Sequence, residues 1–201
     1  MCARYYLEIS FDMRPFIEKM MDSLLAHEWE KMTTIKTSGE VFPTDVVPVI
    51  ATNRAGGQSV FPMKWGFDGK NLLINARVET ASEKATFKDA WKSHRCIVPA
   101  SHYFEWEHLV TDDGKKKTGA KYAIKSEDPN LWLCGLYRFE NNMPVFVILT
   151  REASENIRFI HDRMPLIMPD DLKNDWIRLE ADPKALINGA LNPSSFTSLS
   201  H

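Results

Sequence analysis

The sequence CIVPASHYFEWEHLV (residues 96–110) contains two strand candidates in direct succession, and this hairpin-like order indicates the class of fold. CIVPA is a short apolar run of the kind that forms a buried strand. HYFEWEHLV alternates, and a period of two places Tyr103, Glu105 and Glu107 on one face, with aromatic residues on the other. In such a setting a carboxylate is expected to lose part of its hydration, which raises its pKa and suits it to proton transfer.

Strand candidates also lie on both sides of this stretch. Turn chemistry separates them, for example Asp68-Gly69 and Asn141-Asn142. The run 42–53 carries Pro43 and Pro48 and is interpreted as a loop that leads into an edge strand. The other candidates are YYLEI (5–9), SVFPMKWGF (59–67), NLLINARV (71–78), KYAIKS (121–126), LWLCGLYRF (131–139) and MPVFVILT (143–150).

Helical patterns lie outside the run of strands. An apolar stripe at four-residue spacing predicts a helix from Asp12 to about Lys31. Together the elements predict an α+β fold with a curved, largely antiparallel sheet or barrel-like core and peripheral helices. We expect a single domain over residues 1–201, with a frayed tail after about residue 192. The other predicted helices are 84–94, 151–162, 169–177 and 182–190.

Composition limits the function classes. The chain has 201 residues, 44% of them hydrophobic, and a net charge of −2. The overall charge therefore does not indicate a polyanion as the partner. It contains no apolar run of transmembrane length and no signal-peptide pattern, so we expect a cytoplasmic protein with no membrane partner. The three widely spaced cysteines, Cys2, Cys96 and Cys134, indicate neither a disulfide framework nor a metal site. No cofactor is expected.

Four polar positions are candidates for chemistry: Cys2, Asn75, Glu105 and His161. Each also has an ordinary structural interpretation. A strand glutamate usually faces solvent, a histidine at a helix end often caps it, and an asparagine often belongs to a turn. Cys2 is distinctive because the initiator Met is usually removed before so small a residue. The product would carry a free α-amine and a thiol on one residue.

The four positions lie in or beside seven sequence blocks that cover most of the chain: MCARYY, FPTDVVPVI, MKWGF, INARVET, RCIVPASHYFEWE, LCGLYR and IHDRMPLIM. In sequence and in order, these blocks resemble the SRAP (SOS-response-associated peptidase) family, also called abasic-site processing proteins. Ala3 departs from the family pattern, which has Gly there.

This resemblance implies an SRAP fold and covalent capture of abasic sites in single-stranded DNA. The α-amine of mature Cys2, with a reference pKa of about 7.7–8.0, would attack the ring-opened sugar aldehyde in lyase-like Schiff-base chemistry. The thiol would then close a thiazolidine ring, a step that high effective molarity favours. Glu105 would transfer protons, His161 would assist sugar opening, and Asn75 would hydrogen-bond the sugar.

The resemblance also implies DNA contacts. Arg4 and Arg77 would bind phosphates, Pro43 and Trp65 would stack on or wedge between bases, and Thr150 is a further phosphate candidate. The expected partner is single-stranded DNA with an abasic site, bound by a monomer, with a nucleoid association in a bacterium.

Two other functions stay open. The same Cys2 suits an N-terminal-nucleophile thiol hydrolase, which would remove Met1 or cleave another amide. The other is a non-catalytic module that binds nucleic acid or protein, in which Cys2 has no chemical role.

Overall fold

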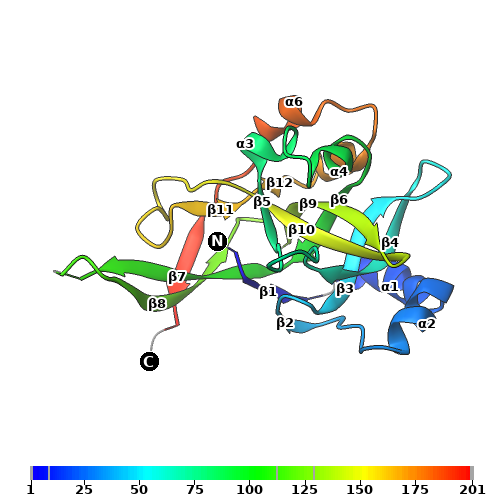
Figure 1. The fold of residues 1–201 in the computed structure, drawn as a ribbon, viewed down its shortest axis with the longest axis horizontal. Helices are drawn as coiled ribbons and strands as arrows, with labels where there is room; N and C mark the ends of the chain where they lie inside the picture. The colour runs from blue at the N-terminus through cyan, green and yellow to red at the C-terminus, as the bar shows by residue number, and fades with distance from the viewer. Residues whose placement is uncertain (1, 9, 112, 129, 200–201) are drawn as a thin grey trace.

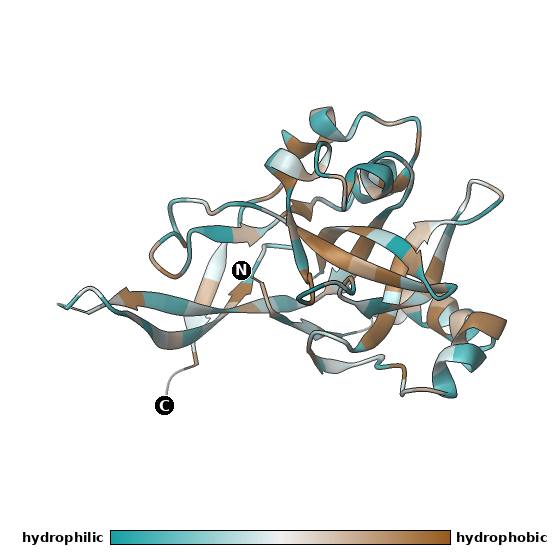
Figure 2. Cartoon of the chain, viewed as in Figure 1, coloured by the Kyte–Doolittle hydropathy of each residue, from teal (hydrophilic) through white to brown (hydrophobic). Residues whose placement is uncertain are grey.

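The computed structural model describes residues 2–8, 10–111, 113–128 and 130–199. Its strands form two sheets, one of five and one of eight strands, with helices outside them (Figure 1). The apolar strands run through the centre of the molecule, and the more polar segments lie around them (Figure 2). The predicted α+β class with a barrel-like core and peripheral helices is confirmed.

Five strands of the larger sheet close into a barrel. β10 pairs antiparallel with β9 and parallel with β4, which completes the ring β10-β4-β3-β6-β9. Closure of this kind pairs each barrel strand on both of its sides. Short strands extend the sheet: β5 (Asn75–Arg77) runs parallel to β10, β11 (Arg163–Pro165) pairs with β10, and β12 (Ile167–Met168) pairs with β9. The barrel strands are β3 (Val46–Thr52), β4 (Gln58–Trp65), β6 (Arg95–Ala100), β9 (Leu131–Glu140) and β10 (Met143–Glu152).

The smaller sheet carries the N-terminal strand. Its order is β13-β8-β7-β1-β2, and each pair in it is antiparallel. The long hairpin of β7 and β8 reaches away from the barrel (Figure 1). A core between the two sheets buries Tyr5 and Tyr103 together with Trp65 of the barrel. The strands are β1 (Arg4–Leu7), β2 (Gly39–Val41), β7 (His102–Val110), β8 (Lys116–Lys125) and β13 (Ser195–Ser198).

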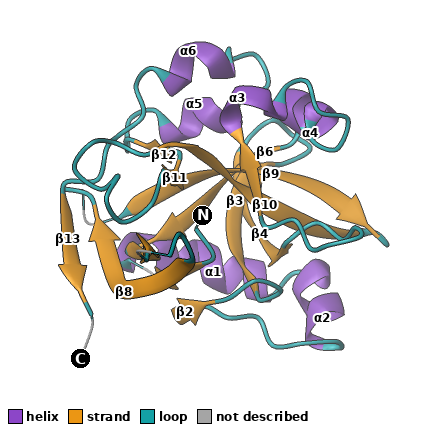
Figure 3. Ribbon diagram, turned by 60° about the vertical axis from the view of Figure 1, so that its left-hand side comes forward, coloured by secondary structure: helices purple, strands orange, loops and turns teal. Residues whose placement is uncertain are grey.

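Helices cover the sheets in two groups (Figure 3). One group, α1 and α2, packs beside β4, and the other, α3 to α6, lies at the opposite end of the barrel. Across the described ranges, we find no helix with the length and apolar character needed to span a lipid bilayer. The helices are the 3-10 turn η1 (Phe11–Met13), α1 (Arg14–Met21), α2 (Leu24–Glu30), α3 (Val78–Ala81), α4 (Lys88–Ser93), α5 (Lys173–Ile177) and α6 (Pro183–Ile187).

Two helix predictions need correction. The predicted continuous helix from Asp12 to Lys31 is broken, because the Ser23 hydroxyl accepts a hydrogen bond from the Ala26 N–H and starts α2 as a new helix. The predicted helix over residues 151–162 is wrong: Arg151 and Glu152 end β10, and the residues after them form a loop with turns. Within it, the Ser154 hydroxyl donates to the side-chain oxygen of Asn156 at 2.6 Å, and the Asn156 amide donates to the Pro193 carbonyl at 2.8 Å.

The loop-and-edge interpretation of residues 42–53 was also wrong for its second half. β3 is a strand of the barrel wall, not an edge strand, and pairs with both β4 and β6. The ladder tolerates the proline because Pro48 lies opposite Pro62 of β4, so that neither strand presents an N–H at that pair.

The predicted fraying after residue 192 does not hold for residues 195–198. These residues form β13 on the edge of β8. The strand is fastened by side chains as well as by backbone pairing, because Phe196 contacts the rings of Tyr122 and Phe159 at centroid distances of 5.9 and 5.2 Å. Residues 200–201 of the predicted tail, like the last residue of the predicted strand 5–9, lie outside the described residues.

Arg95, at the start of β6, links the barrel to the helices. Its side chain is 3% exposed, and its guanidinium donates to main-chain carbonyls from three segments. Hydrogen bonds from a charged donor stabilise this connection more than neutral bonds would. The acceptors are Trp176 O at 2.7 Å, Trp91 O at 3.0 Å, Ala181 O at 3.2 Å, Lys92 O at 3.4 Å and Arg178 O.

We predict that Arg95→Met lowers the free energy of unfolding by about 2–4 kcal/mol, because methionine fills the space and leaves buried carbonyls without donors. Urea denaturation followed by circular dichroism measures this change. Arg54→Met is the matched control, since Arg54 lies in an exposed turn and should shift stability by less than about 0.5 kcal/mol. Equal effects of the two substitutions would contradict a structural role for Arg95.

Candidate active site

Cys2 lies between the two sheets. It precedes β1, its side chain is 0% exposed, and it belongs to the core cluster that contains Tyr5 and Trp65. The Asn75 amide, at the start of β5, donates from Nδ2 to the Cys2 carbonyl at 2.8 Å. Because β5 is fixed to β10, this bond ties the beginning of the chain to the barrel.

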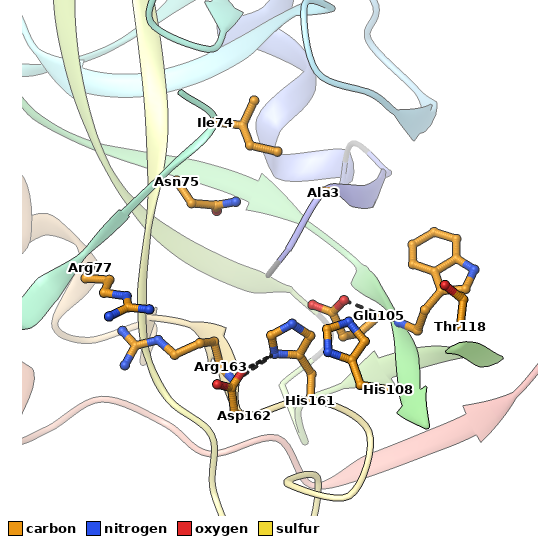
Figure 4. Close-up of a pocket in the computed structure, with 11 residues that line it drawn as sticks. Ala3, Ile74, Asn75, Arg77, Glu105, His108, Thr118, His161, Asp162 and Arg163 are labelled. Atoms are coloured by element: carbon orange, nitrogen blue, oxygen red, sulfur yellow. Dashed lines mark hydrogen bonds and ion pairs between the residues drawn. The ribbon is translucent and has the colours of Figure 1, made fainter. Parts of the chain in front are cut away.

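An open cavity of about 600 Å³ lies beside this point (Figure 4). Its walls come from the N-terminal segment, β5, β7, β8 and the loop that leads into β11. It therefore brings together Asn75, Glu105 and His161, three of the predicted catalytic residues, next to the segment that carries the fourth. The lining residues are Ala3, Ile74, Asn75, Arg77, Glu105, Trp106, His108, Thr118, His161, Asp162 and Arg163.

Glu105 projects from β7 into this cavity (Figure 4). It is 4% exposed, and its Oε1 accepts a hydrogen bond from the Trp106 N–H at 3.3 Å. Burial removes water from the carboxylate and raises its pKa. The carboxylate therefore takes up a proton more readily than that of an exposed glutamate.

His161 is the second-last residue of the loop between β10 and β11, and a hydrogen bond from Ala153 N to Asp162 O at 2.9 Å closes this loop at its base. Its ring is 7% exposed, and burial lowers its pKa to about 4. Nδ1 accepts from the Arg163 N–H at 2.9 Å, which places the ring proton on Nε2. Nδ1 also lies 2.8 Å from Asp162 Oδ1, but that contact is an ion pair only in the protonated ring. The lowered pKa favours the neutral form, with Nε2–H as a donor.

The Cys2 thiol is also held in its neutral form. Burial, and then the nearby Glu105 carboxylate, raise its pKa to about 12. Sγ lies 3.7 Å from the carbonyl oxygen of Arg4, the acceptor for its weak S–H donor. At neutral pH this sulfur reacts only if a neighbouring group accepts its proton.

Two arginines form a cationic rim on one side of the cavity (Figure 4). Arg77 is exposed. Arg163 is held by both oxygens of Glu79, each at 2.8 Å, and donates to the Thr150 carbonyl at 2.7 Å. Arg77 is therefore the cation better placed to meet an anion from solvent.

Arg4 and Pro43 lie outside the cavity lining. Arg4 pairs with Glu40 at 3.3 Å, and its guanidinium lies 4.3 Å from the ring centroid of Phe42 and 5.1 Å from that of Trp106. Pro43 is half-buried in the turn between β2 and β3. Trp106 lines the cavity as well, so these residues form a surface that continues from it.

Trp65 and Thr150 are fully buried, at 0% exposed each. The Trp65 indole N–H donates to the Ile74 carbonyl at 2.9 Å, and the Thr150 hydroxyl lies 3.5 Å from the Ala76 carbonyl. Neither side chain reaches the surface in this conformation. We assign both to the support of β5 and do not carry them forward as DNA contacts.

The sequence pattern did not single out His108. Strict alternation placed it on the face opposite Glu105, yet both residues line the cavity. The β7–β8 pairing slips between Trp106 and His108, where β8 uses one more residue than β7. Such irregularities redirect side chains beside active sites, and the signal that could have marked this one is Gly119, a glycine inside β8 at the slip.

Metal-binding chemistry has no clear candidate in the part of the chain that the structure describes, since no group of three or more His, Cys, Asp or Glu side chains is placed to hold an ion. A second hollow, of about 880 Å³, lies by His94, Tyr137 and Phe139 and contains none of the predicted site residues.

Comparison with known proteins gives one family throughout. A family model described as SOS response associated peptidase (SRAP) matches residues 1–200. Abasic site processing protein YoqW of Bacillus subtilis (strain 168) is 30% identical over 207 residues, which cover 96% of this chain and 87% of that protein. Abasic site processing protein YedK of Escherichia coli (strain K12) is 31% identical over 160 residues, or 71% of each chain.

Solved structures share the fold. A phage-related protein from Bordetella bronchiseptica superposes with a TM-score of 0.74 at 18% identity, over 100% of this chain and 95% of that one. A protein from Bacteroides thetaiotaomicron gives 0.69 at 19% identity, over 98% and 90%. At these identities the likeness concerns the fold alone.

We predict that the His161 ring titrates with a midpoint near pH 4, against an ordinary value of 6.5. Between these values the unfolded chain binds the extra proton, so this histidine makes folding less favourable as pH falls from about 6.5 to about 4. NMR titration of the imidazole C–H signals, assigned with His161→Gln, measures the midpoint. A midpoint near 6.5 would show that the ring is not held neutral.

Proposed function

The chain belongs to the SRAP family, and on that premise we propose that it processes abasic sites in DNA by capturing them covalently through Cys2. The observation that carries the proposal is the hydrogen bond from Asn75 to the Cys2 carbonyl. It holds the first residue of the processed chain at a cavity lined by an acid–base pair, Glu105 and His161. The substrate would be the aldehyde form of an abasic sugar in single-stranded DNA, bound by a monomer.

The first step uses the α-amine that removal of Met1 exposes. An α-amine has a reference pKa of about 7.7–8.0, so a fraction of it is neutral and nucleophilic at physiological pH. Its attack on the aldehyde carbon forms a C–N bond, and loss of one water gives an iminium. His161, as a neutral donor through Nε2–H, would hydrogen-bond the sugar oxygen during ring opening.

The second step uses the thiol. Sulfur adds to the iminium carbon, forms the C–S bond, and releases its proton. Because the pKa of the thiol is raised to about 12, this step requires a proton acceptor, and the Glu105 carboxylate fits that role. The ring closes within one residue, so high effective molarity offsets the low thiolate population.

Asn75 would contribute a second contact. Its Oδ1 is buried and has no hydrogen-bond partner among the residues that the structure describes. A buried acceptor of this kind is costly to leave unpaired. A hydroxyl of the opened sugar is a donor of suitable size, so Asn75 would hold Cys2 with its nitrogen and the substrate with its oxygen.

The DNA strand would follow the cations and aromatic rings at the cavity. We propose that Arg77 binds a phosphate beside the abasic site, and that Arg4 and Pro43 lie along the continuing strand. Few phosphates are then contacted, so binding should weaken moderately with added salt. A net charge of −2 is compatible with such a local channel.

The alternative function is a thiol hydrolase that uses the same Cys2, on its own Met1 or on another amide. Amide hydrolysis by this route needs a thiolate, and the raised pKa of the buried thiol disfavours one. Addition of the thiol to an iminium needs less thiolate, because the iminium is a stronger electrophile than an amide and the ring closure is intramolecular. The burial of Cys2 therefore favours abasic-site capture.

We predict that the processed protein forms a heat-resistant adduct with an abasic single strand on denaturing gels, without added reductant. Cys2→Ser keeps the amine, so its imine should be trapped by borohydride and should decay on heating without it. A form extended by residues before Cys2 masks the amine and should form no adduct, although its thiol is intact.

Cys134→Ala is the matched control, because Cys134 is another buried thiol, far along the chain in β9, and its loss should leave the adduct unchanged. A heat-resistant adduct from the extended form would contradict the role of the amine. Amide hydrolysis that depends on Cys2, in a protein that forms no adduct, would support the hydrolase instead.

A further inference from the structure

His108 lines the cavity, and neither the motifs nor the proposed chemistry gives it a role. It follows the slip in the β7–β8 pairing and lies beside His161 and Glu105 (Figure 4). Its ring centroid is 4.2 Å from that of His161, with the two planes inclined by 57°. Two imidazoles at this distance cannot both carry a positive charge without strong repulsion.

The structural role at this position belongs to the backbone. The His108 N–H donates to the carbonyl of Ile160 at 3.0 Å, which fastens the His161 loop to β7. Any residue other than proline would make that hydrogen bond. This hydrogen bond therefore does not explain why a histidine occupies position 108.

His108 differs from its two neighbours in its access to water. Glu105 and His161 are 4% and 7% exposed, whereas His108 is exposed. The charged and titratable groups that face it are Glu105 of its own strand, His161 and Asp162 of the loop, Arg163 of β11, and Arg77 across the cavity. Protons that enter or leave the buried pair therefore have an exposed imidazole in contact with one of its members.

We propose that His108 is the proton-exchange residue of this site and carries protons between solvent and the buried groups while the adduct forms. This inference rests on the proposed function. His161 would act as a fixed hydrogen-bond donor, and His108 would be the imidazole that changes its protonation state during the reaction.

The proton balance gives such a residue a task. The departing hydroxyl takes up one proton to leave as water, and the thiol releases one proton when the C–S bond forms. An imidazolium at His108 can supply the first proton, and the neutral ring can receive the second from Glu105 or from solvent. The residue then returns to its starting state after each adduct.

The test is the pH dependence of the rate of adduct formation for the processed wild type and His108→Gln. We expect the variant to react about 10-fold more slowly near pH 7 and to lose a limb of the pH–rate profile. Imidazole added to the buffer should restore part of the rate, which it would not do if His108 only supported the loop. The affinity of the variant for a single strand that lacks an abasic site, and so cannot form the adduct, should equal that of the wild type.

His102→Gln is the matched control, since His102 is a histidine of the same strand that stacks on Tyr6 outside the cavity, and its rate and profile should equal those of the wild type. An unchanged rate and profile for His108→Gln, with the wild type reactive, would overturn the inference and leave the proposed function in place. A wild type that forms no adduct would overturn both.

Discussion

The hydrogen bond from Asn75 Nδ2 to the Cys2 carbonyl is the contact on which the site depends. It spans 73 positions of sequence and joins the two sheets, because β5 is paired with barrel strand β10 and residue 2 precedes β1 of the smaller sheet. The barrel supplies Asn75, and the smaller sheet supplies Glu105. The bond adds to the burial of Cys2 and to the pairing of β1 with β2 and β7, and chain termini are poorly ordered unless they are tied down in this way.

Burial then determines which chemistry each group can perform. It raises the pKa of the Glu105 carboxyl and of the Cys2 thiol and lowers that of the His161 ring, so each pKa moves in the direction that favours the neutral form of its group. Such shifts suit the condensation of an amine with an aldehyde, in which protons must move in both directions. In the proposed function, the charge that binds an anion would come from the rim, where Arg77 is exposed and Arg163 is anchored by Glu79.

Much of this arrangement was predictable from the sequence, and the reasons differ by element. Strands were predictable because β9 and β10 show apolar runs bounded by turn residues and β7 shows alternation with a period of two. The family resemblance identified the residues that meet at the cavity. Helix ends were harder to predict from the sequence, since the break at Ser23 depends on one side-chain hydrogen bond. The roles of Trp65 and Thr150 depend on burial, which a local motif does not reveal. His108 was missed because a one-residue slip in pairing leaves no mark in the pattern of β7.

The central claim is that the reactive centre is the aminothiol of processed Cys2, and intact-mass spectrometry before and after reaction with an abasic single strand tests it most directly. The account predicts a starting mass that lacks Met1 and a product mass equal to protein plus DNA minus one water, stable without reductant. A product that forms on protein retaining Met1, or a processed protein whose mass does not change, would contradict it.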